Sequence, residues 1–231
     1  MKTAGIIGGT GPESTVEYYR LIIAAYREQK RDGHYPQMII NSINLTRVVN
    51  LIEANDLTAL VEYLLGEVGR LARAGADFGL LSANTPHIVF DELNRQSPIP
   101  LISIIEATRE AAEALGLKKL GLIGTRFTMQ GGFYREVFSR KGIALVVPDD
   151  SEQAFIHDAY MNELVKGSFL NETRERLLAI VDGLRERQGI EGVILGGTEL
   201  PLILPPDTAR DIPFLDTTRI HVKRIVAELL S

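Results

Sequence analysis

The sequence predicts an α/β protein of two similar halves, in which parallel sheets are flanked by helices. Short apolar runs such as 78–81 and 193–195 alternate with helical patterns such as 57–71. The runs are apolar throughout, as expected for parallel strands that are covered on both faces. The chain also repeats itself, because Gly5-Ile6-Ile7-Gly8 returns as Gly121-Leu122-Ile123-Gly124. Together these observations indicate a duplicated, doubly covered parallel sheet.

The first half of the chain predicts four strands and four helices in alternation. Pro12 suits the first position of a helix that carries its apolar residues at helical spacing up to Tyr26. Asp56 is an N-cap, and Gly75 closes the helix that follows it. Strands are expected at 4–7, 37–40, 78–81 and 101–103, and the other two helices at 88–93 and 106–115.

The second half shows the same alternation of strands and helices. Strands are expected at 120–123, 144–147, 193–195 and 213–215, and helices at 130–140, 152–165, 173–187 and 218–230. Asn171 is expected to cap the helix 173–187, and 200–204 is a short helical turn. Residues 5 and 121 lie 116 positions apart, whereas Thr85 and Thr198 lie 113 apart. We expect one lobe of residues 1–98 plus 212–231, a second of residues 99–211, and a ligand between the two.

Composition excludes several classes of function. A net charge of −5, with no basic stripe, argues against nucleic-acid binding. Apolar runs are too short to span a membrane, and no signal-peptide pattern opens the sequence, so a cytoplasmic location is expected. The chain has no cysteine, which excludes thiolate nucleophiles, thiol bases and cysteine-bound zinc. Its four histidines are scattered without metal-ligand spacing, so no metal is expected.

Two polar stretches follow buried strands and are the candidate site. Ser82 to His87 come after the run 78–81, and Gly196 to Glu199 come after 193–195. Ligands of open α/β sheets bind at the carboxyl ends of strands, and turns that enter helices present N–H groups to anions. A nucleotide loop at Gly8–Gly11 is the less favoured alternative, because the stretch departs from G-x-G-x-x-G and Asn41 follows the second strand where an acid is expected.

These stretches also carry a family resemblance. The chain resembles the aspartate/glutamate racemases that work without pyridoxal phosphate. The markers are Gly5 to Thr10 with Pro12 to Thr15, Asn84 to His87, Gly124 to Thr128, and Gly196 to Glu199. The resemblance covers essentially the whole chain. It implies a two-lobed fold, a homodimer, no cofactor, and a small acidic amino acid or related carboxylate as ligand.

The resemblance also implies two catalytic cysteines, on opposite faces of the substrate α-carbon, that remove and return its proton. The first maps to Ala83, or to Ser82 in the subgroup whose cysteine comes one residue earlier, and the second maps to Gly197. Both positions are therefore replaced. An unassisted serine hydroxyl is a far weaker base than a thiolate near neutral pH.

Other family features carry over to residues that this chain retains. The resemblance implies that polar groups of Asn84, Thr85 and Thr198 hold the α-carboxylate, with Thr10 and Thr125 lining the same site. Arg47 and Lys166 match the positions that grip a side-chain carboxylate, which a guanidinium reads in bidentate fashion.

Three side chains are candidate catalytic groups, and each has a structural alternative. Ser82 is the hydroxyl at the first vacant position. His87 could be a general base, because histidine ordinarily titrates near neutrality, or it could instead pack the helix after its turn. Glu199 could be a base of raised pKa, or it could cap the helical turn 200–204.

Three functions stay open on this evidence. The first is an amino-acid racemase or related isomerase that uses other groups than thiols. The second is a decarboxylase, lyase or hydrolase built on the same scaffold. The third is a small-carboxylate-binding protein without catalysis.

Overall fold

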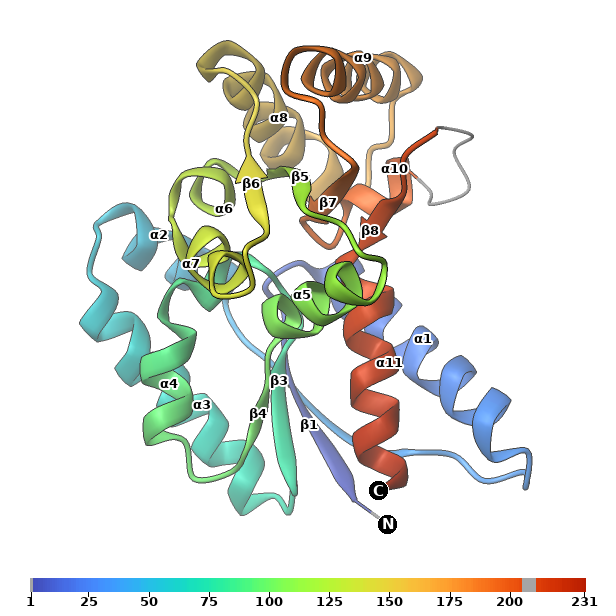
Figure 1. Cartoon of the computed structure of the whole chain (residues 1–231). Helices are drawn as coiled ribbons and strands as arrows, with labels where there is room; N and C mark the ends of the chain where they lie inside the picture. The colour runs from blue at the N-terminus through green and yellow to red at the C-terminus, as the bar shows by residue number, and fades with distance from the viewer. Residues whose placement is uncertain (1, 205–210) are drawn as a thin grey trace. The chain divides into compact units, whose positions relative to one another are not determined.

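Figure 1 shows the computed structural model, which describes residues 2–204 and 211–231. The chain divides into two compact units: residues up to Ile104 together with His221–Ser231, and residues Ile105–Ile220. Each unit is built on a four-stranded parallel sheet with helices on its faces (Figure 1). The predicted α/β class is confirmed.

The sheet of the first unit has the strand order β2-β1-β3-β4. Its strands are β1 (Thr3–Gly8), β2 (Gln37–Ser42), β3 (Phe78–Leu81) and β4 (Leu101–Ile102). Its helices are α1 (Pro12–Lys30), α2 (Leu45–Glu53), α3 (Leu57–Arg73), the 3-10 turn η1 (Thr85–Val89), α4 (Phe90–Gln96) and most of α11 (Thr217–Leu230).

The core of this unit forms where α1 and α11 cover one face of the sheet. Tyr18 and Ile22 of α1, with Val222 of α11, pack against Ile6 and Leu80 of the central strands. Figure 1 shows the blue α1 and the red α11 beside each other along this sheet. Burial of such side chains removes apolar area from water, which is the dominant favourable term in folding.

The sheet of the second unit repeats the topology, with the order β6-β5-β7-β8. Its strands are β5 (Lys119–Gly124), β6 (Ala144–Val146), β7 (Gly192–Gly196) and β8 (Phe214–Asp216). Its helices are α5 (Ile104–Ala114), α6 (Arg126–Gln130), α7 (Phe133–Ser139), α8 (Asp150–Asn162), η2 (Leu164–Lys166), α9 (Asn171–Gln188) and α10 (Leu200–Ile203). The predicted duplication is therefore visible as one strand order used twice.

Helices α8, α9 and α10 supply the apolar side chains that bury one face of this second sheet. Ile156 and Tyr160 of α8 and Leu177 of α9 cluster with Ile123 and Leu195 of the two central strands. Helix α8 begins sharply, because Asp149 and Glu152 form a reciprocal capping box. This fixed start sets the register in which α8 presents Tyr160 to the sheet.

The predicted boundaries between the halves are one strand too early at both crossings. Residues 99–104 belong with the first unit, since Leu101 pairs with Gly79 in the first sheet. Residues 212–220 belong with the second unit, since Phe214 pairs with Val193. The physical reason is that the last strand of each sheet, β4 or β8, pairs with the sheet that precedes it in the chain, and the chain passes to the other unit only after that strand.

Three local predictions need correction. Helix α2 was not expected; Asn44 caps it by accepting the N–H of Arg47, at 3.4 Å. The helix predicted at 130–140 is α7, which begins only at Phe133 because Gly132 before it takes a φ of 77°, and the turn predicted before it contains the separate helix α6. Asn171 is the first residue of α9 rather than its cap, a position that Leu170 holds.

Within the described part of the chain, no helix is both long enough and apolar enough to cross a membrane.

Candidate functional site

The glycine turn after β1 is held in place by side chains of the first turn of α1. The N–H of Gly9 donates to Oγ1 of Thr15 at 2.9 Å, and that hydroxyl donates to the carbonyl of Gly11 at 3.1 Å. Gly9 has a φ of 80°, a conformation that side-chain-bearing residues rarely adopt. Thr10 therefore stands, partly exposed, on a fixed turn at the carboxyl end of β1.

Ser82 follows β3 directly and is fully buried. Its N–H and its hydroxyl both donate to the carbonyl of Ile7, at 3.0 Å and 3.1 Å. The hydroxyl of Ser14 in turn donates to the carbonyl of Ser82 at 2.9 Å. These bonds tie the turn after β3 to β1 and to the first turn of α1, and they engage the Ser82 hydroxyl in the fold.

His87 is engaged at both ring nitrogens. Nδ1 donates to the carbonyl of Ala83 at 2.9 Å, and Nε2 accepts the N–H of Ile104 at 3.3 Å. The ring is buried and stacks on Phe90 with an interplanar angle of 7°. Burial, together with repulsion from the charged form of His221, lowers the pKa of His87 to about 3. The ring is therefore neutral and hydrogen-bonded at both nitrogens, which favours the packing role of His87 over that of a general base.

The remaining candidates of the first unit lie at strand ends of the same sheet edge. Asn84 is buried and precedes η1, whose first residue, Thr85, is partly exposed. Arg47 lies in the first turn of α2, after β2; it is exposed, and its guanidinium carbon lies 4.1 Å from the centre of the Tyr63 ring. The cation–π contact holds this guanidinium extended over α3.

In the second unit, Thr125 and Lys166 occupy different elements. Thr125 follows β5 and caps α6: its Oγ1 accepts the N–H of Thr128 at 3.3 Å and lies 3.2 Å from the hydroxyl of that residue. Lys166 ends η2 and is exposed. The threonine thus has a structural bond at the strand end, whereas the lysine side chain reaches solvent.

Glu199 is a buried carboxylate at the end of β7, with 1% of its surface exposed. Its Oε2 accepts hydrogen bonds from the hydroxyl of Tyr160 and, at 3.0 Å, from that of Thr198. The residue occupies the N-cap position of α10, but its side chain makes no capping bond. The alternative role foreseen for Glu199, that of a helix cap, is therefore not realised.

Tyr160 is the site residue that the sequence did not reveal. It lies in the last turn of α8, 39 residues before Glu199, and no local motif marks it. Burial, the nearby charge of Glu199 and the hydrogen bond to that carboxylate raise the pKa of the Tyr160 phenol well above its ordinary value. The phenol is therefore neutral and donates to an acceptor carboxylate.

Gly197 and Tyr160 are matched in shape. A Cβ added at Gly197 would overlap Cε2 of Tyr160 and lie 2.8 Å from both Cζ and Oη of the same ring. Real Cβ atoms essentially never come so close to a heavy atom. Residue 197 can therefore carry a side chain only if Tyr160 moves.

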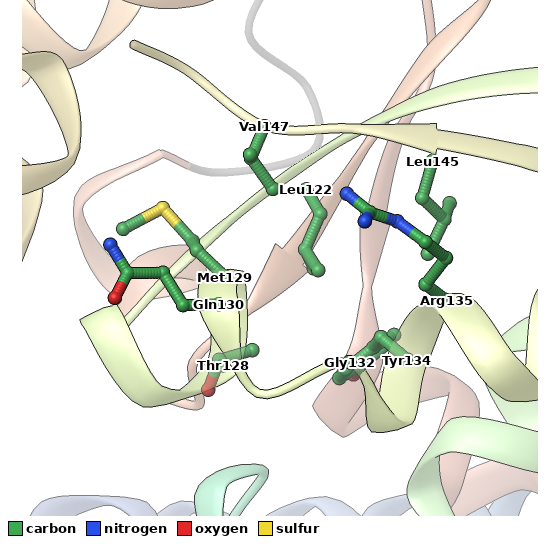
Figure 2. A pocket seen from close by; sticks show the side chains of 9 residues that line it. All are labelled: Leu122, Thr128, Met129, Gln130, Gly132, Tyr134, Arg135, Leu145 and Val147. Carbon is green, nitrogen blue, oxygen red and sulfur yellow. The ribbon is translucent and has the colours of Figure 1, made fainter. Parts of the chain in front are cut away.

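The second unit also contains a pocket of about 240 Å³ between the β5–β6 side of its sheet and helices α6 and α7 (Figure 2). Figure 2 shows Arg135 of α7 extended across the pocket toward Leu122. None of the candidate residues named above lines it. The lining is Leu122, Thr128, Met129, Gln130, Gly132, Tyr134, Arg135, Leu145 and Val147.

No group of three histidine or acidic side chains suited to a metal ion occurs in residues 2–204 and 211–231.

The comparisons with known proteins agree with this architecture. The sequence model of the Asp/Glu/hydantoin racemase family matches residues 7–225. An aspartate racemase homologue from Pyrococcus horikoshii OT3 has 37% identity and a TM-score of 0.85, with each chain covered completely. The chain therefore belongs to the Asp/Glu/hydantoin racemase family.

Two further relatives span the chain at lower identity. The broad specificity amino-acid racemase RacX of Bacillus subtilis strain 168 is 24% identical over 232 residues, or 98% of both chains. The aspartate racemase of Picrophilus torridus has a TM-score of 0.79 at 24% identity, covering 99% of this chain and 94% of its own. The fold is thus shared across family members that have diverged widely in sequence.

Proposed function

We propose that this protein moves the α-proton of aspartate, glutamate or a related small carboxylate, and so racemises it, with groups other than thiols. The proposal combines membership of a racemase family with a chain that contains no cysteine. Proton transfer at an α-carbon needs a positioned base, and a carboxylate can serve when its surroundings tune its basicity.

The main support for this proposal is the environment of the Glu199 carboxylate. Glu199 is a buried carboxylate two residues after Gly197, the second vacant cysteine position, and it accepts hydrogen bonds from two hydroxyls rather than capping its helix. Of the three candidates, Ser82 and His87 are instead engaged with backbone groups of the first unit. Glu199 is thus the preferred base.

The ligand class follows from the retained polar residues. We propose that Thr10, Asn84, Thr85, Thr125 and Thr198 contribute to holding the α-carboxylate, and that Arg47 and Lys166 read a second carboxylate. Arg47 and Lys166 are both exposed cations, in line with a role in recruiting an acidic ligand.

A second candidate function is carboxylate binding without catalysis. The hydrogen bonds of Ser82 and His87 favour it, because both side chains are bonded to backbone groups and so stabilise the fold of the first unit. A decarboxylase, lyase or hydrolase built on the same scaffold is the third candidate, and the mass of the product would distinguish it. Assembly as a homodimer and a cytoplasmic location stay predictions.

The test is incubation of the protein with L- and D-aspartate and L- and D-glutamate in heavy water. Deuterium at the α-carbon, followed by NMR, is the expected result for at least one of the four amino acids. The Glu199→Gln variant should lose the exchange. A ligand-dependent rise in melting temperature without exchange would leave a binding protein. A product of different mass would indicate another superfamily reaction.

A further inference from the structure

The ring of Tyr160 takes the place that a side chain at residue 197 would fill. Its Oη lies 2.8 Å from the position of a Cβ at Gly197, and a cysteine sulfur would stand one bond beyond that Cβ. The phenol oxygen therefore lies in the neighbourhood where the second thiol would be. Tyr160 comes from α8, whereas residue 197 follows β7, so the replacement group arrives from a different element.

The hydroxyl and the Glu199 carboxylate form a defined pair. Tyr160 Oη donates to Oε2 of Glu199, which also accepts the Thr198 hydroxyl at 3.0 Å. All three side chains are at least nine-tenths buried. The low-dielectric surroundings fix the orientation of the phenol toward the carboxylate.

We propose that Tyr160 and Glu199 together replace the missing thiol as an acid–base pair, a proposal that rests on the α-proton chemistry proposed above. The α-C–H bond breaks, and its proton bonds to Tyr160 Oη. The phenol's own proton passes to Oε2 of Glu199. The electron pair of the broken bond moves into the α-carboxylate of the substrate, and the reverse steps return a proton.

Passing the proton onward removes the main obstacle to a tyrosine base. A phenolate would have to form beside the negative charge of Glu199 in a buried site, which is costly. In the paired step the phenol stays neutral throughout, and the charge moves from the carboxylate to the substrate. The step needs no oxidant, reductant or further reactant.

The deciding variant is Tyr160→Phe, which keeps the ring next to Gly197 and removes only the hydroxyl. Its α-deuteration rate, on whichever of L- or D-aspartate or glutamate the wild type exchanges, should fall by about a hundredfold to ten-thousandfold. Glu199→Gln should fall comparably. The control Tyr134→Phe removes another buried tyrosine hydroxyl of the same unit and should exchange at the wild-type rate.

Melting temperatures with and without the amino acid separate chemistry from structure. In Tyr160→Phe the ligand-induced rise should persist while exchange is lost, which a merely structural role would not produce. Should Tyr160→Phe fail to fold, Glu199→Gln carries the same test.

Exchange that continues at the wild-type rate in Tyr160→Phe but is lost in Glu199→Gln would overturn the pair and leave the proposed function standing, with Glu199 as the base. Absence of exchange in the wild type, with all four amino acids, would overturn the proposed function itself. The two failures are therefore distinguishable.

Discussion

At the scale of single residues, the contact between Gly197 and Tyr160 makes a prediction about stability that does not depend on activity. Gly197→Ala places a Cβ against the Tyr160 ring, so the variant should lose about 1–3 kcal/mol of unfolding free energy by overpacking. Denaturant unfolding measures the loss.

The double variant supplies the control for that measurement. Tyr160→Ala alone opens a cavity, but it also removes the atoms that the new Cβ meets. The cost of adding Gly197→Ala should therefore shrink in the Tyr160→Ala background, as a double-mutant cycle reports. Additive effects would mean that the ring does not occupy this place.

At the scale of elements, His221 anchors the C-terminal helix to the first unit. Its Nδ1 accepts the Tyr18 hydroxyl at 2.8 Å, and its Nε2 donates to the carbonyl of Ile102 at 3.0 Å. One side chain of α11 thus ties together α1 and the edge strand β4. A buried group left without its partner costs about 1–3 kcal/mol.

His221→Ala should accordingly lower the unfolding free energy by about 1–3 kcal/mol, because the buried Tyr18 hydroxyl and the half-buried Ile102 carbonyl each lose a partner. Lys223→Ala is the matched control, as an exposed residue of the same helix, and should change stability by about 0.5 kcal/mol or less. Equal effects of the two substitutions would refute the anchoring role.

The elements also show how far the sequence could predict this protein. Strands such as 78–81 were predictable because every residue is apolar, and the repeat of Gly5 to Gly8 at Gly121 to Gly124 revealed the second sheet. The lobe boundaries were wrong because β4 and β8 lie next to the crossovers and no local signal says which sheet a strand joins. Helix α2 was missed although Asn44 offered a cap signal.

The candidate site was predictable only in part, for the same reason. Glu199 is the last residue of the motif Gly196 to Glu199, so its position after a strand could be inferred. Its partner Tyr160 lies 39 residues away on another helix. The engagement of Ser82 and His87 with backbone carbonyls and N–H groups depends on tertiary placement, which residue type does not encode.

At the scale of the whole molecule, two buried histidines set a dependence of stability on pH. Burial lowers the pKa of His221 to about 4 and, with repulsion from His221, that of His87 to about 3, against an ordinary 6.5. Both values are lower in the folded state, so the unfolded chain binds more protons between pH about 6.5 and 3. Stability is therefore full above pH 6.5 and falls as the pH drops.

The expected slope is about 1.4 kcal/mol per pH unit for each histidine inside that window. Denaturant unfolding at several pH values between 4 and 7 measures it. In a His87→Gln variant the slope should be smaller than in the wild type by about 1.4 kcal/mol per pH unit, which is the contribution of one histidine. A slope that is unchanged in this variant would mean that His87 does not titrate on unfolding.

Proton transfer is also expected to occur mainly at one face of the substrate α-carbon. The second unit contains the Tyr160–Glu199 pair, whereas the side chains of Ser82 and His87 in the first unit are hydrogen-bonded to backbone carbonyls. A single acid–base pair returns a proton to the face from which it removed one, and inversion is then the slower event in which water delivers a proton to the opposite face. Exchange with solvent should therefore outpace inversion.

The most direct measurement is which enantiomer of aspartate first gains α-deuterium when the wild-type protein and L-aspartate are mixed in heavy water. A single acid–base pair on one face should give early deuterium in the remaining L-aspartate, before D-aspartate accumulates. Deuterium that appears first and only in D-aspartate would contradict it, because that pattern requires a second base on the opposite face.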